Sequence, residues 1–168
     1  HIGLLTRIAI VFTRRKINID SLTVSESAIS GVYKFTIVIQ STPDLIVKIV
    51  RQIEKQIDVM KAFYHTNEEI IYQEIALYKV STDALYENNT IEKVVRNAGA
   101  RILEITREYT VIEKTGHKHE TQDLFDDLSQ YGVLQFTRSG RVAVTKLSEE
   151  LLTNYLREIN YNENENNK

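Results

Sequence analysis

The strongest constraint on the fold of this chain is an order of apolar segments that runs along it twice. From residue 70 onward, the spacing of apolar residues gives strand, helix, strand, strand, helix, strand. Residues 3–64 give helix, strand, strand, helix, strand, the same order without its opening strand. The polar stretch 66–69 separates the halves. The chain is therefore predicted to contain two copies of one architecture.

That architecture is an α+β fold of two tandem βαββαβ, or ferredoxin-like, domains. We expect the first domain over 1–66, a joint at 67–69, the second domain over 70–147, and a short helix with a disordered polar tail over 148–168. The missing opening strand would lie inside its sheet, where its absence exposes a row of backbone groups. We therefore expect about 8–12 residues, one strand and a turn, before His1.

The elements of the first half are predicted from side-chain periodicity and capping residues. Thr42 can cap a helix, Pro43 suits its first position, and Asp44 favours the positive end of its dipole. The expected elements are a helix over 3–16 with Leu5, Ile8, Ala9 and Phe12 on its apolar side, strands over 17–25 and 32–40, a helix continuing through Leu45, Ile49, Ile53 and Ile57, and a strand over 59–64.

The elements of the second half follow in the same way. Asn89 and Glu92 form a capping box for a helix over 91–97, which Gly99 is placed to end. The other expected elements are a strand over 70–80, a hairpin of strands 101–106 and 109–115, a helix from Lys118 carrying Leu124, Phe125 and Leu128, a strand over 133–138, and the short terminal helix over 148–159 with Leu151, Leu152, Tyr155 and Leu156.

The strand over 17–24 changes phase part-way along. Ile17 and Ile19 alternate with polar residues, whereas Leu22 and Val24 continue the alternation on even numbers. A slip of one residue turns the apolar set to the other face unless the backbone absorbs it. The pattern predicts a bend or bulge at residues 20–21.

Composition excludes several classes of protein. The chain has 168 residues, 42% of them hydrophobic and 26% charged, with a formal net charge of −2 and no cysteine. This balance lacks the basic surface of a nucleic-acid-binding protein and excludes disulfides. No apolar run has the length of a membrane span, and no signal peptide is visible. We expect a cytoplasmic protein that binds neither nucleic acid nor membrane.

One small group of residues suits an amino-acid ligand. Gly3, Leu4 and Leu5 lie where a loop enters a helix, so free backbone N–H groups can bind a carboxylate. Asn18 carries donors and an acceptor for the polar end of the ligand. Leu4, Leu5 and Ile19 would supply apolar walls for an aliphatic side chain. The alternative is that Gly3 is a turn glycine and Asn18 an edge residue of the sheet.

The run HIGLLTRIAIVFTRRKINIDSLTVS resembles the ACT domain of the acetolactate synthase (acetohydroxyacid synthase) small subunit. In that family's pattern, Lys16 stands where glycine is usual and Ile17 where an aromatic residue is usual. The stretch DLFDDLSQYGVLQFTRSGRVAV resembles the family's C-terminal domain, with its Arg138-Ser139-Gly140 turn. The matching positions of the first domain are Gly3, Leu5, Arg7, Ile8, Phe12, Arg15, Asn18, Ile19, Ser21, Leu22, Thr23 and Val24.

The resemblance implies a regulatory subunit without catalytic residues or cofactors of its own. The large subunit of the family carries thiamine diphosphate, FAD and Mg²⁺, and the small subunit raises its activity and confers feedback inhibition by branched-chain amino acids, usually valine. The ACT domains pair as a homodimer and bind the effector at their interface. Carried over, Gly3 and Leu4 donate backbone N–H groups, and Asn18 and Ile19 of the neighbouring subunit complete the pocket.

Four other hypotheses are weaker. His117, His119 and Glu120 could bind a metal, but i,i+2 residues do not share a helix face. The sequon at residues 88–90 reads better as a helix cap. A transcriptional regulator would need a helix-turn-helix and a basic surface, and a self-sufficient enzyme would need a catalytic constellation; the sequence shows neither. A free-standing ACT-type sensor is the remaining alternative.

Overall fold

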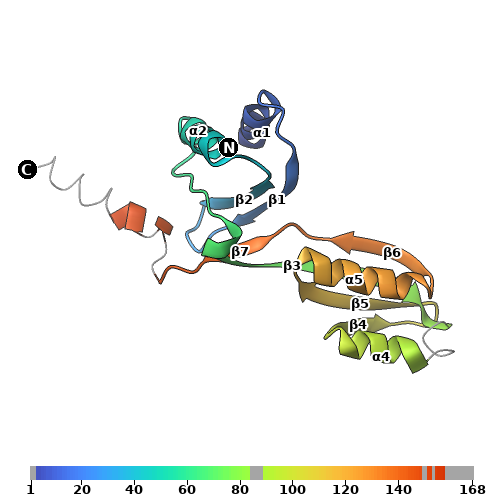
Figure 1. Ribbon diagram of the computed structural model, residues 1–168. Coiled ribbons are helices and arrows are strands. Elements are labelled where there is room, and N and C mark those ends of the chain that lie inside the picture. Colours follow the sequence, from blue (N-terminus) through green and yellow to red (C-terminus); the bar gives the residue numbers. More distant parts are fainter. Residues whose placement is uncertain (1–2, 84–88, 149–150, 153, 158–168) are drawn as a thin grey trace, which may run out of the picture. The chain divides into compact units, whose positions relative to one another are not determined.

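The computed structural model describes residues 3–83, 89–148, 151–152 and 154–157 (Figure 1). The elements are α1 (Leu4–Thr13), β1 (Ile19–Glu26), β2 (Tyr33–Ile39), α2 (Pro43–Glu54), the 3₁₀ helix η1 (Asn67–Glu69), β3 (Ile70–Ser81), α4 (Asn89–Asn97), β4 (Arg101–Ile105), β5 (Tyr109–Gly116), α5 (Lys118–Ser129), β6 (Val133–Arg138) and β7 (Val142–Thr145).

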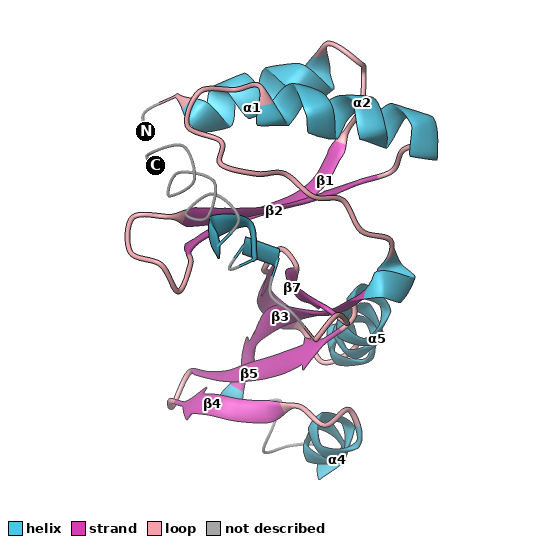
Figure 2. Cartoon of the chain, turned by 90° about the vertical axis from the view of Figure 1, so that its left-hand side faces the viewer, coloured by secondary structure: helices cyan, strands magenta, loops and turns pink. Residues whose placement is uncertain are grey.

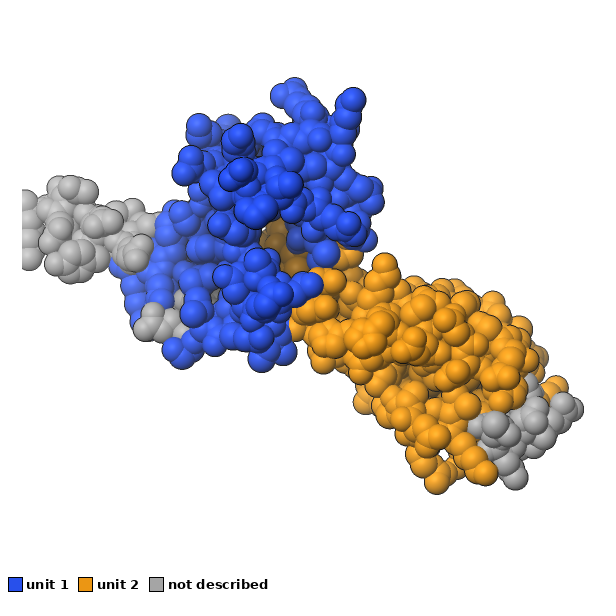
Figure 3. All heavy atoms as spheres, in the orientation of Figure 1, with its two compact units in different colours: residues 1–20, 37–71, 143–168 blue, residues 21–36, 72–142 orange. Residues whose placement is uncertain are grey.

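The chain divides into two compact units (Figure 3). The first contains residues 1–20, 37–71 and 143–168, and the second contains 21–36 and 72–142. The division passes through β1 and β2, which together form a two-stranded sheet. The boundaries of the compact units therefore differ from the predicted domain boundaries at residues 66 and 70. The domain boundaries stay a prediction.

The fold is α+β with two ferredoxin-like units, as predicted. In the second unit the strands follow the order β4-β5-β3-β6 with antiparallel neighbours, the order expected of βαββαβ. The predicted hairpin is β4–β5. Strand β7, which also pairs with β3, was not predicted.

The core of the second unit lies between this sheet and helices α4 and α5, which cover one of its faces (Figure 2). Gly99 has φ 62°, and Ala100 N–H donates to the carbonyl of Val95, so the predicted end of α4 is confirmed. The buried side chains come from strands and helices alike: Ala76, Tyr78, Val80 and Ile112 from the sheet, and Ile91, Val95, Leu124 and Leu128 from the helices.

In the first unit, α1 and α2 pack side by side (Figure 2). Two predicted apolar positions are wrong: Leu5 is 47% exposed, and Ile57 is 79% exposed because α2 ends at Glu54. Val11 is buried as well as the predicted Ile8 and Phe12, because it follows Ile8 by three residues and so lies on the same face of α1. Among its described residues, the buried apolar side chains of this unit are Ile8, Val11, Phe12, Ile49 and Ile53.

The predicted strand over residues 59–64 is not formed, which corrects the sequence analysis. In βαββαβ topology the fourth strand pairs with the first, and no strand precedes α1 among the described residues. Without a neighbour, the apolar alternation of this segment has no ladder to join. Its side chains remain open, with Met60, Phe63 and Tyr64 all exposed.

After α1 ends, the chain contains a residue in the left-handed backbone conformation, which the periodicity of the sequence did not predict. Lys16 has φ 56°, and Ile17 N–H donates to the carbonyl of Phe12 at 3.1 Å. Strand β1 therefore begins at Ile19 rather than at Ile17, and it runs without a break to Glu26. The bulge expected at residues 20–21 stays a prediction.

The remaining predictions concern the start of α4 and the C-terminal residues, and the structure describes these only in part. The capping side chain proposed for Asn89 lies outside the described residues, and α4 already begins at that position. Of the short helix expected over 148–159, residues 151–152 and 154–157 are helical. The polar tail over 160–168 lies outside the described residues.

Candidate functional site

The N-terminus of α1 presents backbone N–H groups to an open surface. Gly3 is the N-cap with φ 85° and ψ −2°, and no side chain caps the helix. The first intrahelical bond runs from Arg7 N–H to the carbonyl of Gly3 at 3.1 Å, so the N–H groups of the first turn are those that a helix leaves without intrahelical partners. A Cβ built on Gly3 meets no atom within 4 Å. A small anion can therefore approach this backbone closely.

Asn18 and Ile19 lie at the other predicted part of the site. Asn18 is exposed, and its Nδ2 lies 3.5 Å from Oδ1 of Asp20, which is long for a hydrogen bond. Its carboxamide is thus held weakly and remains accessible. Ile19, half-buried, opens β1. How these residues face the Gly3 loop of a neighbouring subunit stays a prediction.

Arg7 fixes α1 against the segment that follows α2. Its Nη2 donates to the carbonyl of Ile57 at 3.2 Å and to Oδ2 of Asp58 at 3.1 Å. Asp58 adopts φ 76°, a conformation that side chains other than glycine, asparagine and aspartate rarely take. Sequence reasoning did not give Arg7 this role, although its place in the family pattern was a signal.

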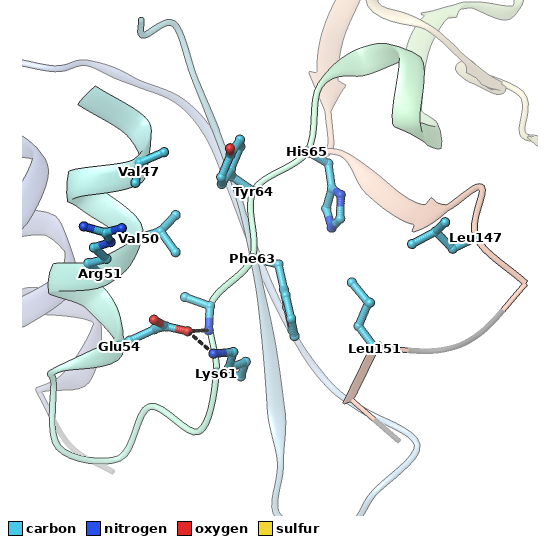
Figure 4. A pocket seen from close by; sticks show the side chains of 11 residues that line it. Val47, Val50, Arg51, Glu54, Lys61, Phe63, Tyr64, His65, Leu147 and Leu151 are labelled. Atoms are coloured by element: carbon cyan, nitrogen blue, oxygen red, sulfur yellow. Dashed lines mark hydrogen bonds and ion pairs between the residues drawn. The ribbon is translucent and has the colours of Figure 1, made fainter. Parts of the chain in front are cut away.

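The first unit also contains an open groove of about 420 Å³, between α2 and residues 61–65 (Figure 4). Glu54 accepts hydrogen bonds from Lys61 and from Ala62 N–H, and the bond from Lys61 holds the pKa of Glu54 below its usual value. No predicted effector residue lines the groove. Its lining is Val47, Val50, Arg51, Glu54, Lys61, Ala62, Phe63, Tyr64, His65, Leu147 and Leu151.

His117, His119 and Glu120, considered above as metal ligands, lie at the N-terminus of α5, where His117 and Glu120 cap the helix. Glu120 accepts a hydrogen bond from His117 N–H at 2.6 Å, and together they close a capping box for α5. The same bond lowers the pKa of Glu120. Within the described part of the chain, no three histidine, cysteine, aspartate or glutamate side chains gather as metal ligands.

The Arg138-Ser139-Gly140 turn is held tightly to β3. Ser139 N–H donates to the carbonyl of Ile75 at 2.8 Å, and Ile75 N–H donates to Oγ of Ser139 at 2.9 Å. Arg138 donates to Gln122 at 3.1 Å and lies 3.9 Å from the buried carboxylate of Glu74. The two Ser139 bonds make this turn an extension of the sheet.

Known proteins resemble both halves of the chain. Residues 1–61 match the family model of the AHAS small subunit-like ACT domain, and residues 73–147 match the model of the small subunit of acetolactate synthase. The chain is 31% identical to the acetolactate synthase small subunit of Bacillus subtilis over 149 residues, which are 88% of this chain and 86% of that one. The chain belongs to the acetolactate synthase small-subunit family.

Other members agree with this assignment. A probable acetolactate synthase small subunit of Archaeoglobus fulgidus is 29% identical over 144 residues, 86% of this chain and 89% of that one. The crystal structure of the acetolactate synthase small subunit from Thermotoga maritima superposes with a TM-score of 0.78 at 28% identity, covering 89% of this chain and 92% of that one. In the part of the present chain that the structure describes, no helix is long and apolar enough to cross a membrane.

Proposed function

We propose that this chain is a regulatory subunit that binds valine, or a related branched-chain amino acid, between two ACT domains. The N–H groups of Gly3 and Leu4 at the start of α1, which no side chain caps, would hold the carboxylate. Asn18 and Ile19 of the neighbouring copy would bind the amino group and part of the side chain. The observation that carries the proposal is the uncapped N-terminus of α1 within the segment matching the ACT family model.

The partner is a catalytic large subunit, because relatives of this chain are named as small subunits of acetolactate synthase. In this proposal the chemistry and its cofactors (thiamine diphosphate, FAD and Mg²⁺) belong to that partner, and this chain raises its activity in the cytoplasm. The effector acts by binding one dimer arrangement more tightly than another, and its influence is limited to that difference in affinity.

Reconstitution tests the proposal. The full chain is mixed with the large subunit, and acetolactate formation is measured while valine, leucine and isoleucine are titrated. We expect the small subunit to stimulate the large subunit and at least one of the three amino acids to reverse the stimulation. A large subunit whose rate is unchanged by the small subunit would contradict the proposal.

A free-standing amino-acid sensor is the alternative. It predicts binding of a branched-chain amino acid without any association with the large subunit. Co-elution of the two subunits in size-exclusion chromatography separates the hypotheses, since only the regulatory subunit forms a stable complex. The match of residues 73–147 to the small-subunit model favours the regulatory subunit.

A further inference from the structure

Strand β1 links the candidate effector residues to the second compact unit. Its first residues, Ile19 and Asp20, belong to the first unit, and residues 21–26 belong to the second. Ile19 is one of the residues assigned to the effector under the proposed function. A displacement of Ile19 along the strand axis is passed to the residues after it, because a strand is extended backbone.

Within the second unit, β1 closely approaches Gly140 of the Arg138-Ser139-Gly140 turn. A Cβ built on Gly140 would lie 2.3 Å from Oγ1 of Thr23 and 3.5 Å from the backbone of Leu22. Real Cβ atoms do not approach other heavy atoms as closely as 2.3 Å. A side chain at position 140 would therefore force Thr23 or its neighbours to shift, because of the close approach of β1 and not because of the φ angle of Gly140.

The strand side of this contact carries an energetic cost. Oγ1 of Thr23 and Oγ of Ser21 are buried and have no hydrogen-bond partner among the described residues. The two hydroxyls lie on the same face of β1, since alternate residues of a strand share a face. A buried hydroxyl without a partner costs about 1–3 kcal/mol.

The turn side of the contact is rigid. Oγ of Ser139 donates to the carbonyl of Gly140 at 2.8 Å, in addition to the two bonds that join Ser139 to Ile75. On either side of Gly140, Arg138 and Arg141 approach the carboxylate of Glu74 at 3.9 and 3.5 Å. A movement of β1 against this turn must be taken up by the strand or be passed to the whole sheet.

We propose that Thr23 and Gly140 are positioning residues, and that their contact transmits effector occupancy from β1 to the sheet of the second unit. This inference rests on the proposed function and names the route of its regulation. Neither residue touches the effector. The packing of Thr23 against Gly140 determines how strongly effector binding at Asn18 and Ile19 displaces the sheet of the second unit.

The test compares valine binding by the isolated full chain with valine binding at saturating large subunit. The ratio of the two dissociation constants is the coupling factor between effector and partner. Gly140→Ala forces Thr23 away and should weaken the coupling, so that the coupling factor moves closer to one. The expected change in the factor is about 2- to 30-fold, the range for residues that modulate coupling. The dissociation constant of the isolated chain should stay within about twofold of wild type, since Gly140 lies outside the effector site.

Thr23→Ala supplies the rescue. It removes the atom that a Cβ at position 140 would strike, so the double variant Thr23→Ala/Gly140→Ala should recover most of the wild-type coupling factor. A general loss of stability would not be repaired in this way. Ser25→Ala, at an exposed position two residues further along β1, is the matched control and should behave as wild type.

The outcomes are distinguishable. A wild-type coupling factor in Gly140→Ala, or a double variant as defective as the single one, would overturn the role of the contact while leaving the effector site intact. Absence of binding of valine, leucine and isoleucine alike by the wild-type chain would instead overturn the proposed function, and this inference with it. Circular dichroism of each variant verifies that the chain is folded.

Discussion

Arg7 in α1 donates to Asp58 at 3.1 Å and to the carbonyl of Ile57 at 3.2 Å, across 50 residues of sequence. This pair joins the helix that begins at the candidate effector loop to the segment after α2. Exposed ion pairs contribute little, but hydrogen bonds to charged groups contribute more than neutral ones. The pair therefore stabilises the position of α1 chiefly through its hydrogen bonds.

Replacement of Arg7 by alanine should lower the free energy of unfolding by about 1–2 kcal/mol. Urea unfolding followed by circular dichroism measures the change. Arg14→Ala is the control, because this exposed residue lies at the end of the same helix; it should alter stability by no more than about 0.5 kcal/mol. Equal effects of the two substitutions would show that the contact with Asp58 contributes nothing.

Lys16 adopts φ 56°, where a side chain costs about 1–2 kcal/mol and glycine costs nothing. Lys16→Gly removes this strain but gives the unfolded chain more entropy, worth about 0.4–1 kcal/mol. We expect a net stabilisation of up to about 1.6 kcal/mol, the difference between the two contributions, measured by thermal unfolding. Arg14→Gly, at a right-handed position with φ −60°, should destabilise by about 0.5–1 kcal/mol. A loss of stability in both variants would refute the strain at Lys16.

Sequence and structure agree where local signals and packing point the same way. The order of the second unit, the end of α4 at Gly99 and the start of α2 after Thr42 were readable from periodicity and local residue types. The side chain of Thr42, however, makes no capping hydrogen bond, so the cap predicted for it is not formed. The strand over 59–64 was not, because its apolar alternation says nothing about whether a neighbouring strand is present. Strand β7 was missed because four residues are too short a run to show a period.

The candidate site shows the same limit. Gly3 and Asn18 could be singled out because glycine before a helix and a carboxamide between two isoleucines are local features. The roles of Lys16, Gly140 and Arg7 depend on a backbone angle or on residues far away in sequence, which a single sequence does not record. The family pattern marked all three positions without giving the reason.

Tyr78 should make the second unit sensitive to alkaline pH. Burial raises the pKa of Tyr78 to about 12, opposed by the charge of Arg138, and its hydroxyl donates to the carbonyl of Thr121 at 2.6 Å. The unfolded chain loses this proton near pH 10. The stabilisation from Tyr78 is therefore complete below pH 10 and is lost as pH rises from 10 to about 12.

Tyr78→Phe should flatten this part of the pH profile of unfolding and should cost about 1–3 kcal/mol at neutral pH, because the Thr121 carbonyl loses its buried donor. Urea unfolding at intervals from pH 7 to about 12 measures both effects. Tyr33→Phe is the control, since Tyr33 is an exposed residue of β2. A profile that Tyr78→Phe leaves as steep as that of wild type would contradict the assignment.

The central claim is that Gly3 forms part of an effector site, and a calorimetric titration of valine into the full chain tests it most directly. Gly3→Asp places a carboxylate against that of the ligand. Like charges in contact cost several kcal/mol, and each 1.4 kcal/mol weakens binding about tenfold. We therefore predict a loss of affinity of at least about a hundredfold.

Gly132→Asp is the matched control for that titration. Gly132 has φ 82° beside φ 85° for Gly3, and a Cβ on either glycine meets no atom within 4 Å. The two substitutions thus carry the same charge and the same backbone strain. We predict that Gly132→Asp binds valine as the wild-type chain does while Gly3→Asp does not. Wild-type affinity in Gly3→Asp would contradict the account.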